Sequence, residues 1–352
     1  MCGIAGFLLA PSERVDTARL TRLLHEGIDP RGGDATGAAW VDSQGQTHHF
    51  TVVGRAREFR SAHPNAAHNA RLAILHTRMA TQGDKRNPLN NHPVRSGHFL
   101  AVHNGHIHND AELFATLPFT RHGEVDSEAI VAVIRHAHMK GESITHALER
   151  VEGRMATAWI DDREPNILHM ARGSASPLAV AMTPKGSVIF ASTLTALDAA
   201  MDGLGLDSDW EALPAEGQYL RFVDGRLSDV ASFTPNEGTP WWEKCGTQGH
   251  KGTHNHYARD QFESDVLGLP KKPAKKKNKP RTVQTASLDT YRNKQEAQRK
   301  ASTELVPYSD DTYQLAFSSG PYGTDPDTWE WGWDAEDLAY IASHLTDKDR
   351  EV

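Results

Sequence analysis

The chain is poor in cysteine, with only Cys2 and Cys245 among its 352 residues. Two cysteines cannot supply the disulfide framework of a small secreted protein. No apolar run approaches the roughly 18 residues that a membrane-spanning helix needs, and the N-terminus lacks a basic region followed by an apolar stretch. We therefore expect a cytoplasmic protein that is neither secreted nor membrane-spanning.

An overall excess of basic residues is also missing. The formal net charge of -8 favours solubility and argues against a nucleic-acid footprint over the whole protein. Hydrophobic residues make up 38% of the chain, which is enough for a sizeable core. The length allows one large domain with a smaller appendage.

One of the two cysteines stands directly behind the initiator, at Cys2. Removal of Met1 by an aminopeptidase would give Cys2 both a thiol and a free α-amine. The α-amine titrates near about 7.7–8.0 and the thiol near about 8.5, so the amine is able to take the thiol proton at neutral pH. This pattern predicts a nucleophile and its base within one residue.

Several short polar motifs follow Cys2 along the chain, and each contains glycine, histidine, arginine or an acidic residue. They are Arg31-Gly32-Gly33-Asp34-Ala35-Thr36-Gly37, His76-Thr77-Arg78-Met79-Ala80-Thr81-Gln82-Gly83, Asn90-Asn91-His92-Pro93, His103-Asn104-Gly105 and Val125-Asp126-Ser127-Glu128, continued by Arg172-Gly173-Ser174 and Glu216-Gly217.

In this order the motifs resemble the glutaminase domain of class II glutamine amidotransferases, the N-terminal-nucleophile (Ntn) hydrolases. The similarity is greatest to the glutaminase domain of glucosamine-6-phosphate synthase, and it covers roughly residues 2–233. It implies an α+β fold in which two stacked antiparallel sheets lie between helix layers, the αββα sandwich. It also implies hydrolysis of L-glutamine to glutamate and ammonia, with no cofactor and no catalytic metal.

The resemblance assigns a role to each site residue. Cys2 is the nucleophile, and the Asn104 side chain and the Gly105 backbone N–H form the oxyanion hole. The residues expected to bind the substrate are Arg78 with help from Thr81 at the α-carboxylate, Asp126 at the ammonium, and Gln82.

Each assignment has a structural alternative. A lone arginine or aspartate is usually a solvated surface charge, and Asn104-Gly105 would by itself be typical of a hairpin turn. The histidines His76, His92 and His103 are expected to pack or hydrogen-bond around the site, since the base is the α-amine.

Two positions depart from the sugar-synthase branch, which usually has Trp and His where this chain has Met79 and Gln82. Methionine fills irregular gaps and glutamine still donates hydrogen bonds, so we expect altered glutamine affinity with the chemistry retained.

Periodicity predicts the main elements. Apolar runs predict buried strands, and apolar residues at 3.6-residue spacing predict two helices. Asp126 is placed to start the second helix. The expected strands are 4–9, 71–75, 99–102, 155–160, 177–181 and 188–191, and the expected helices are 17–25 and 126–137.

We expect the glutaminase domain to span 1–235, a polar Lys/Pro-rich linker to span 236–283, and a small docking segment to span 284–352. The basic stretch 271–281 is interpreted as a solvated spacer, with nucleic-acid contact as the alternative. Trp329, Trp331 and Trp333 precede an amphipathic stretch that is too small to bury a core alone, which favours docking to the main domain or a partner.

Side chains that are able to bind a metal ion occur at short spacing in the C-terminal third of the chain, at Cys245, His250, His254 and His256. They match no zinc motif that we can name, and a histidine-rich surface loop is the preferred interpretation.

The function expected from these features is that of a glutamine amidotransferase subunit. The matched region leaves little chain for the domain that normally consumes ammonia, so we expect an acceptor synthetase or transferase in trans, one example being amidation of a 7-deazaguanine nucleobase. The alternative is a catalytically idle fold used as a structural or assembly protein.

Overall fold

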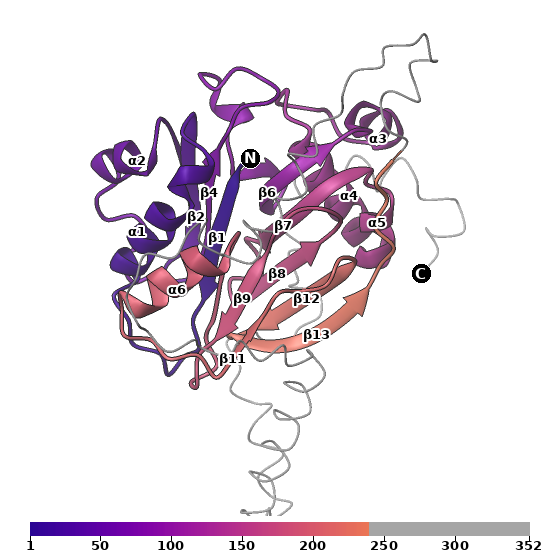
Figure 1. Cartoon of the computed structure of the whole chain (residues 1–352). Helices are drawn as coiled ribbons and strands as arrows, with labels where there is room; N and C mark the ends of the chain where they lie inside the picture. The colour runs from indigo at the N-terminus through magenta and orange to yellow at the C-terminus, as the bar shows by residue number, and fades with distance from the viewer. Residues whose placement is uncertain (239–352) are drawn as a thin grey trace, which may run out of the picture. The chain divides into compact units, whose positions relative to one another are not determined.

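The computed structural model describes residues 1–238, and these form two antiparallel β-sheets packed face to face (Figure 1). The seven-stranded sheet has the order β11-β9-β10-β1-β4-β2-β3, and the six-stranded sheet has the order β13-β12-β8-β7-β6-β5. The strands of the first sheet are β1 (Gly3–Leu8), β2 (Ala35–Val41), β3 (Thr47–Val53), β4 (Leu72–Arg78), β9 (Ala179–Met182), β10 (Val188–Ala191) and β11 (Trp210–Ala212). Those of the second are β5 (Val94–Ser96), β6 (Phe99–Ile107), β7 (Gly153–Asp161), β8 (Ile167–Arg172), β12 (Gln218–Val223) and β13 (Arg226–Ser232).

Helices cover the outer face of each sheet (Figure 1). The seven-stranded sheet carries α1 (Thr17–Ile28), α2 (Ala56–Ala62) and α6 (Leu194–Asp202), and the six-stranded sheet carries α3 (Asp110–Thr116), α4 (Ser127–Lys140) and α5 (Ile144–Glu149). Two short 3-10 turns, Asp29–Arg31 and Pro88–Asn90, complete the regular elements of the described part. The expected α+β, αββα architecture is confirmed.

The predicted strands and helices occur near their expected positions, with ends shifted by a few residues. Helix α1 begins at Thr17 because the Asp16 carboxylate caps it, accepting a hydrogen bond from the Arg19 backbone nitrogen at 2.9 Å. Helix α4 begins after Asp126, but the Asp126 side chain makes no capping hydrogen bond. Its carboxylate is used elsewhere, as described below.

The hydrophobic core has three layers. Two of them lie between a sheet and the helices that cover it, and the third lies between the two sheets. Large side chains such as Phe7 and Leu24 pack between the first sheet and its helices, and Trp159 and Ile130 pack between the second sheet and α4. Residues of opposite parity, such as Ile4, are fully buried between the sheets. The sandwich therefore buries β1 on both faces, with β10 and β4 as its neighbours in the sheet.

The part of the chain that the structure describes ends shortly after the expected domain boundary. The backbone oxygen of Asn236 accepts a hydrogen bond from the Gly153 nitrogen at 2.8 Å, so pairing with the sandwich continues to that residue. The predictions for the Lys/Pro-rich linker beyond residue 238 and for the docking segment 284–352 lie outside the described residues. None of the helices among residues 1–238 is long and apolar enough to span a membrane.

Candidate active site

Strand alternation places three predicted site residues on the sheet faces that look toward each other. On β1 and β4 the odd-numbered residues pack under the helices, so Cys2 and Arg78 share the parity that faces the second sheet. On β6 the odd-numbered residues Ala101 and Ile107 pack under α4, so Asn104 has the parity that faces the first sheet. The Asn-Gly pair lies within a strand, and the hairpin-turn alternative for Asn104-Gly105 is therefore wrong.

The Cys2 thiol lies against the backbone that follows β4. Its Sγ is 3.4 Å from the Met79 nitrogen and 3.6 Å from the Met79 carbonyl oxygen, and Arg31 Nε donates to the Cys2 carbonyl oxygen at 2.9 Å. Burial raises the pKa of the Cys2 thiol, and the Asp126 carboxylate raises it further. The Met79 amide, the chain's α-amine and the Arg78 guanidinium lower the same pKa, so the thiol lies in the fields of both Arg78 and Asp126.

Met1, which precedes Cys2 in the sequence, is 51% exposed, so a peptidase is able to reach it. Its α-amine is 2.6 Å from the Met79 sulfur. Hydrolysis of the Met1–Cys2 peptide bond would leave Cys2 as the first residue, with a free α-amine of its own.

The Arg78 side chain is buried at the end of β4. Its Nη1 donates to Asn91 Oδ1 at 2.9 Å, and its Nη2 donates to the carbonyl oxygens of Gln82 and Gly83, the latter at 3.0 Å. The guanidinium thereby fixes the first turn of the loop that follows β4. Donors at Nε and Nη1 make no further hydrogen bond within the described part of the chain.

Asn104 is 2% exposed, and its Nδ2 has no hydrogen-bond partner among the described residues. A buried amide donor without a partner costs free energy unless something else satisfies it. At the next position, a Cβ on Gly105 would lie 1.8 Å from the Arg154 carbonyl oxygen, so only glycine fits between β6 and β7. The structure therefore places an unpaired buried donor directly before a glycine whose backbone lies close to a neighbouring strand.

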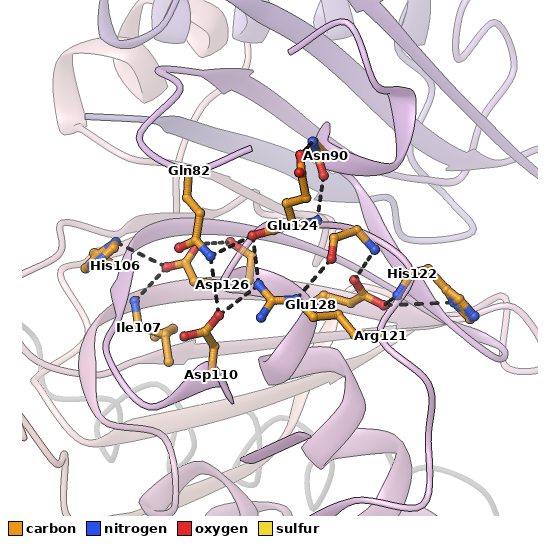
Figure 2. A network of polar contacts seen from close by, with 12 residues as sticks. Gln82, Asn90, His106, Ile107, Asp110, Arg121, His122, Glu124, Asp126 and Glu128 are labelled. Atoms are coloured by element: carbon orange, nitrogen blue, oxygen red, sulfur yellow. Dashed lines mark hydrogen bonds and ion pairs between the residues drawn. The ribbon is translucent and has the colours of Figure 1, made fainter. Parts of the chain in front are cut away.

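The Asp126 carboxylate is buried at the N-terminus of α4 and is held by its neighbours. Its Oδ2 accepts a hydrogen bond from the Ile107 backbone nitrogen at 2.6 Å and lies 3.5 Å from His106 Nδ1 (Figure 2). The Ser127 hydroxyl donates to Oδ1 at 3.3 Å. These contacts keep a negative charge at a fixed point beside the site.

The loop between Met79 and Asn91 is joined to the segment that precedes α4. Gln82 Nε2 donates to the Glu124 carbonyl oxygen at 2.6 Å and lies 3.4 Å from Asp110 Oδ2 (Figure 2). Arg121 pairs with the same Asp110 oxygen at 2.8 Å and donates to the same Glu124 carbonyl at 2.7 Å. The Gln82 amide therefore joins the two segments, while Thr81 beside it is exposed.

Three buried histidines lie around the site, as expected. His76 Nε2 donates to the His103 carbonyl oxygen at 3.0 Å and links the two sheets, and the ring of His92 stacks on His76 at 4.0 Å. His103 Nδ1 is 2.8 Å from the Ser127 hydroxyl. Burial lowers the pKa of all three, that of His76 to about 3, so these rings are neutral at pH 7.

Sequence reasoning assigned no role to Asp34, although it lies in one of the quoted motifs. Asp34 Oδ2 accepts from the Ala80 nitrogen at 2.9 Å, and Lys85 Nζ donates to Oδ1 at 2.7 Å. The hydrogen bond from Lys85, followed by that from Ala80, lowers the pKa of Asp34. Asp34, which directly precedes β2, is thus bonded to two points of the loop that follows β4, at Ala80 and at Lys85.

Residues 1–238 contain no group of three histidine, cysteine, aspartate or glutamate side chains that could hold a metal ion. The set Cys245, His250, His254 and His256 lies outside the residues that the structure describes.

Comparison with known proteins supports the same family. Residues 70–199 match the family model described as a glutamine amidotransferase domain. Glutamine–fructose-6-phosphate aminotransferase (isomerizing) of Staphylococcus epidermidis is 29% identical over 269 residues, covering 73% of this chain and 42% of the relative. The protein of that name in Salmonella paratyphi A is 30% identical over 279 residues, covering 74% and 42%. The chain thus spans less than half the length of the curated relatives it matches.

The fold also matches a solved structure. Glutamine phosphoribosylpyrophosphate amidotransferase from B. subtilis superposes with a TM-score of 0.55 at 20% identity, covering 67% of this chain and 50% of that one. This similarity shows the shared fold. Together with the family model and the ordered motifs, it shows that the chain carries a class II glutamine amidotransferase domain of the Ntn-hydrolase type.

Proposed function

We propose that this chain hydrolyses L-glutamine to glutamate and ammonia through a thioester on Cys2. The observation that carries the proposal is the position of the Cys2 thiol in the fields of both Arg78 and Asp126. Glutamine has a carboxylate and an ammonium at one end and an amide at the other. A cation and an anion that both act on one nucleophile suit that charge pattern.

The proposed reaction begins after loss of Met1. The α-amine of Cys2 takes the thiol proton, and the thiolate attacks the side-chain amide carbon of glutamine. Collapse of the tetrahedral intermediate breaks the C–N bond, and the protonated α-amine returns the proton to the departing ammonia. Water then hydrolyses the γ-glutamyl thioester, which releases glutamate and restores the thiol.

In this scheme Asn104 Nδ2 and the Gly105 backbone N–H stabilise the negative charge that develops on the amide oxygen. The lack of a partner for Asn104 Nδ2 in the described part of the chain supports this assignment. Preorganised donors of this kind stabilise a transition state because they need no reorientation during the reaction.

We assign the α-carboxylate to Arg78 with help from Thr81, and the ammonium to Asp126. Burial of Asp126 among the Ile107 amide, His106 and Ser127 supports a fixed negative charge at that point. For Gln82 we propose a contact with the substrate through its side-chain amide, whose Nε2 also donates to the Glu124 carbonyl oxygen.

The ammonia acceptor remains a prediction. We propose a synthetase or transferase in trans, contacted through residues 284–352 with Trp329, Trp331 and Trp333 as anchors. Amidation of a 7-deazaguanine nucleobase is one candidate for the acceptor reaction. We propose that the protein carries out its function in the cytoplasm. Deleting 284–352 should weaken stimulation by the partner and leave basal hydrolysis intact; loss of folding together with basal activity would contradict the docking role.

The alternative is a retained amidotransferase fold with a structural or assembly role. Retention of the nucleophile and of both charged residues around it favours the enzyme. The test is labelling with a glutamine-mimicking diazoketone, followed by intact mass and peptide mapping. We expect loss of Met1 and one adduct at Cys2, with Cys2→Ala abolishing both the adduct and glutamate release and Cys245→Ala changing neither. Labelling at Cys245 alone, or an unlabelled chain without glutaminase activity, would support the alternative.

A further inference from the structure

A cavity lies on the outer face of the seven-stranded sheet, remote in the fold from the face that carries Cys2. It is a hollow of about 210 Å³ between α1, α2 and the segment that follows α2. Both helices lie side by side on that face (Figure 1). None of the residues assigned to glutamine hydrolysis lines it.

The rim of this cavity is strongly basic. Arg19, Arg22 and Arg60 line it. The guanidinium groups of Arg19 and Arg22 make no hydrogen bond or ion pair within residues 1–238. Arg60 pairs with Glu26 at 2.6 Å, but both side chains are 49% exposed, and an exposed pair of this kind exchanges partners at little cost.

The one acidic residue that lines the cavity offsets the charge of the three arginines only in part. The Asp16 carboxylate caps α1 through the Arg19 backbone nitrogen. It therefore compensates the helix terminus and leaves the guanidinium groups with an excess of positive charge.

The floor carries a buried hydroxyl with no partner. Thr21 is 3% exposed, lines the cavity, and its Oγ1 makes no hydrogen bond among the described residues. A buried hydroxyl that is left unpaired destabilises the fold unless a water or a ligand satisfies it. This observation is independent of the arginines, and it concerns a residue that lines the same hollow.

An aromatic wall completes the cavity. The His63 ring packs against Phe59 with 5.1 Å between ring centroids, and the ring of the buried His25 also lies 5.1 Å from that of Phe59. His25 Nε2 donates to the Gly37 carbonyl oxygen, and burial lowers the pKa of His25 to about 4, so the ring is neutral at pH 7. The wall is thus aromatic, and the His25 ring within it adds no positive charge to that of the basic rim.

We propose that this cavity binds a small soluble phosphate ester. The three guanidinium groups hold the phosphate dianion, the Thr21 hydroxyl bonds one of its oxygens, and the organic group lies on the Phe59 and His63 wall. Guanidinium groups match the tetrahedral oxygens of phosphate through paired, charge-assisted hydrogen bonds. The site is independent of the proposed glutaminase chemistry.

The test is titration of the full-length protein with inorganic phosphate and with phenyl phosphate at constant ionic strength, followed by calorimetry and phosphorus NMR. Both probes should bind with saturation, and phenyl phosphate should bind more tightly because of the aromatic wall. The double variant Arg19→Gln, Arg22→Gln should weaken binding of both probes at least tenfold, and Thr21→Val should weaken it several-fold.

Arg57→Gln is the matched control, since Arg57 lies on α2 but outside this cavity and pairs with Glu58. It should leave both affinities unchanged. Circular dichroism and unfolding midpoints establish that each variant is folded. No saturable binding of either probe, or equal weakening by Arg57→Gln and by the double variant, would overturn the proposal. Unchanged affinity in Thr21→Val would remove the hydroxyl from the site and leave a nonspecific basic surface.

Discussion

Asn90 and Glu124 bond to each other reciprocally. Asn90 Nδ2 donates to Glu124 Oε2 at 2.7 Å, and the Glu124 backbone nitrogen donates to Asn90 Oδ1 at 2.7 Å (Figure 2). Glu124 Oε2 also accepts from the Asp84 nitrogen. The pair therefore connects the loop that follows β4 with the segment that leads into Asp126.

Replacing Asn90 with alanine should loosen this connection. We expect a loss of about 1–2 kcal/mol in the free energy of unfolding, since a part-buried reciprocal pair of hydrogen bonds is removed. We also expect a several-fold higher KM for glutamine with a small change in kcat. Urea unfolding and glutaminase kinetics measure the two effects. The exposed Asn65→Ala serves as the control, and a double-mutant cycle with Glu124→Ala that shows no coupling would contradict the role of the pair.

Arg78 and Asn104 should give different kinetic signatures. Arg78→Lys loses the planar fork and should mainly raise KM. Asn104→Ala removes a donor to the developing oxyanion and should lower kcat by about 10²–10³. Steady-state kinetics with glutamine distinguish the two. A pure KM defect in Asn104→Ala would refute its assignment.

Gly105→Ala should destabilise the domain far more than Gly141→Ala does. The added Cβ at Gly105 meets the Arg154 carbonyl oxygen at 1.8 Å, which forces β6 and β7 apart. At Gly141, after α4, φ is +65° and nothing lies within 4 Å of an added Cβ, so only the backbone strain of about 1–2 kcal/mol is expected. Thermal and urea unfolding compare the variants directly. Equal losses would mean that β6 and β7 separate without cost.

Stability should fall as the pH drops below about 6.5. Burial lowers the pKa of His76 and His169 to about 3 and that of His25 to about 4, whereas the unfolded chain titrates its histidines near 6.5. Below 6.5 the unfolded state binds more protons than the folded state, so the free energy of unfolding declines by about 1.4 kcal/mol per pH unit for each histidine. Urea unfolding between pH 7.5 and 5 measures this slope. His169→Gln should reduce the slope by the contribution of one histidine, and Asn65→Ala, which replaces an exposed side chain that does not titrate, should leave it unchanged.

Several parts of the fold were predictable because apolar spacing carried them. The run from Ile4 and the helix from Thr17 were found in this way, since β1 is buried on both faces and α1 has one apolar stripe. Strand β3 (Thr47–Val53) was not expected, because it lies at the edge of the sheet and is largely polar. Edge strands need fewer apolar residues, so periodicity gives little signal for them.

The candidate site was only partly predictable. The motifs gave Cys2, Arg78 and Asn104 as candidate site residues through a family resemblance, and strand parity in the structure places these three residues on facing surfaces. The Asp126 carboxylate was expected at a helix start, but the structure uses it to accept the Ile107 amide. The contacts of Glu124 depend on two loops meeting in space, and no local sequence pattern encodes such a meeting.

The position of Cys2, immediately before a central strand that is bonded on both sides, governs how the protein has to be produced. For the proposed chemistry an N-terminal affinity tag would replace the required amine with an amide. A purification handle therefore belongs at the other terminus, or behind a protease site whose cleavage leaves cysteine as the first residue. Preparations with an uncleaved leader would be folded but inert, and they would serve as a ready-made negative control.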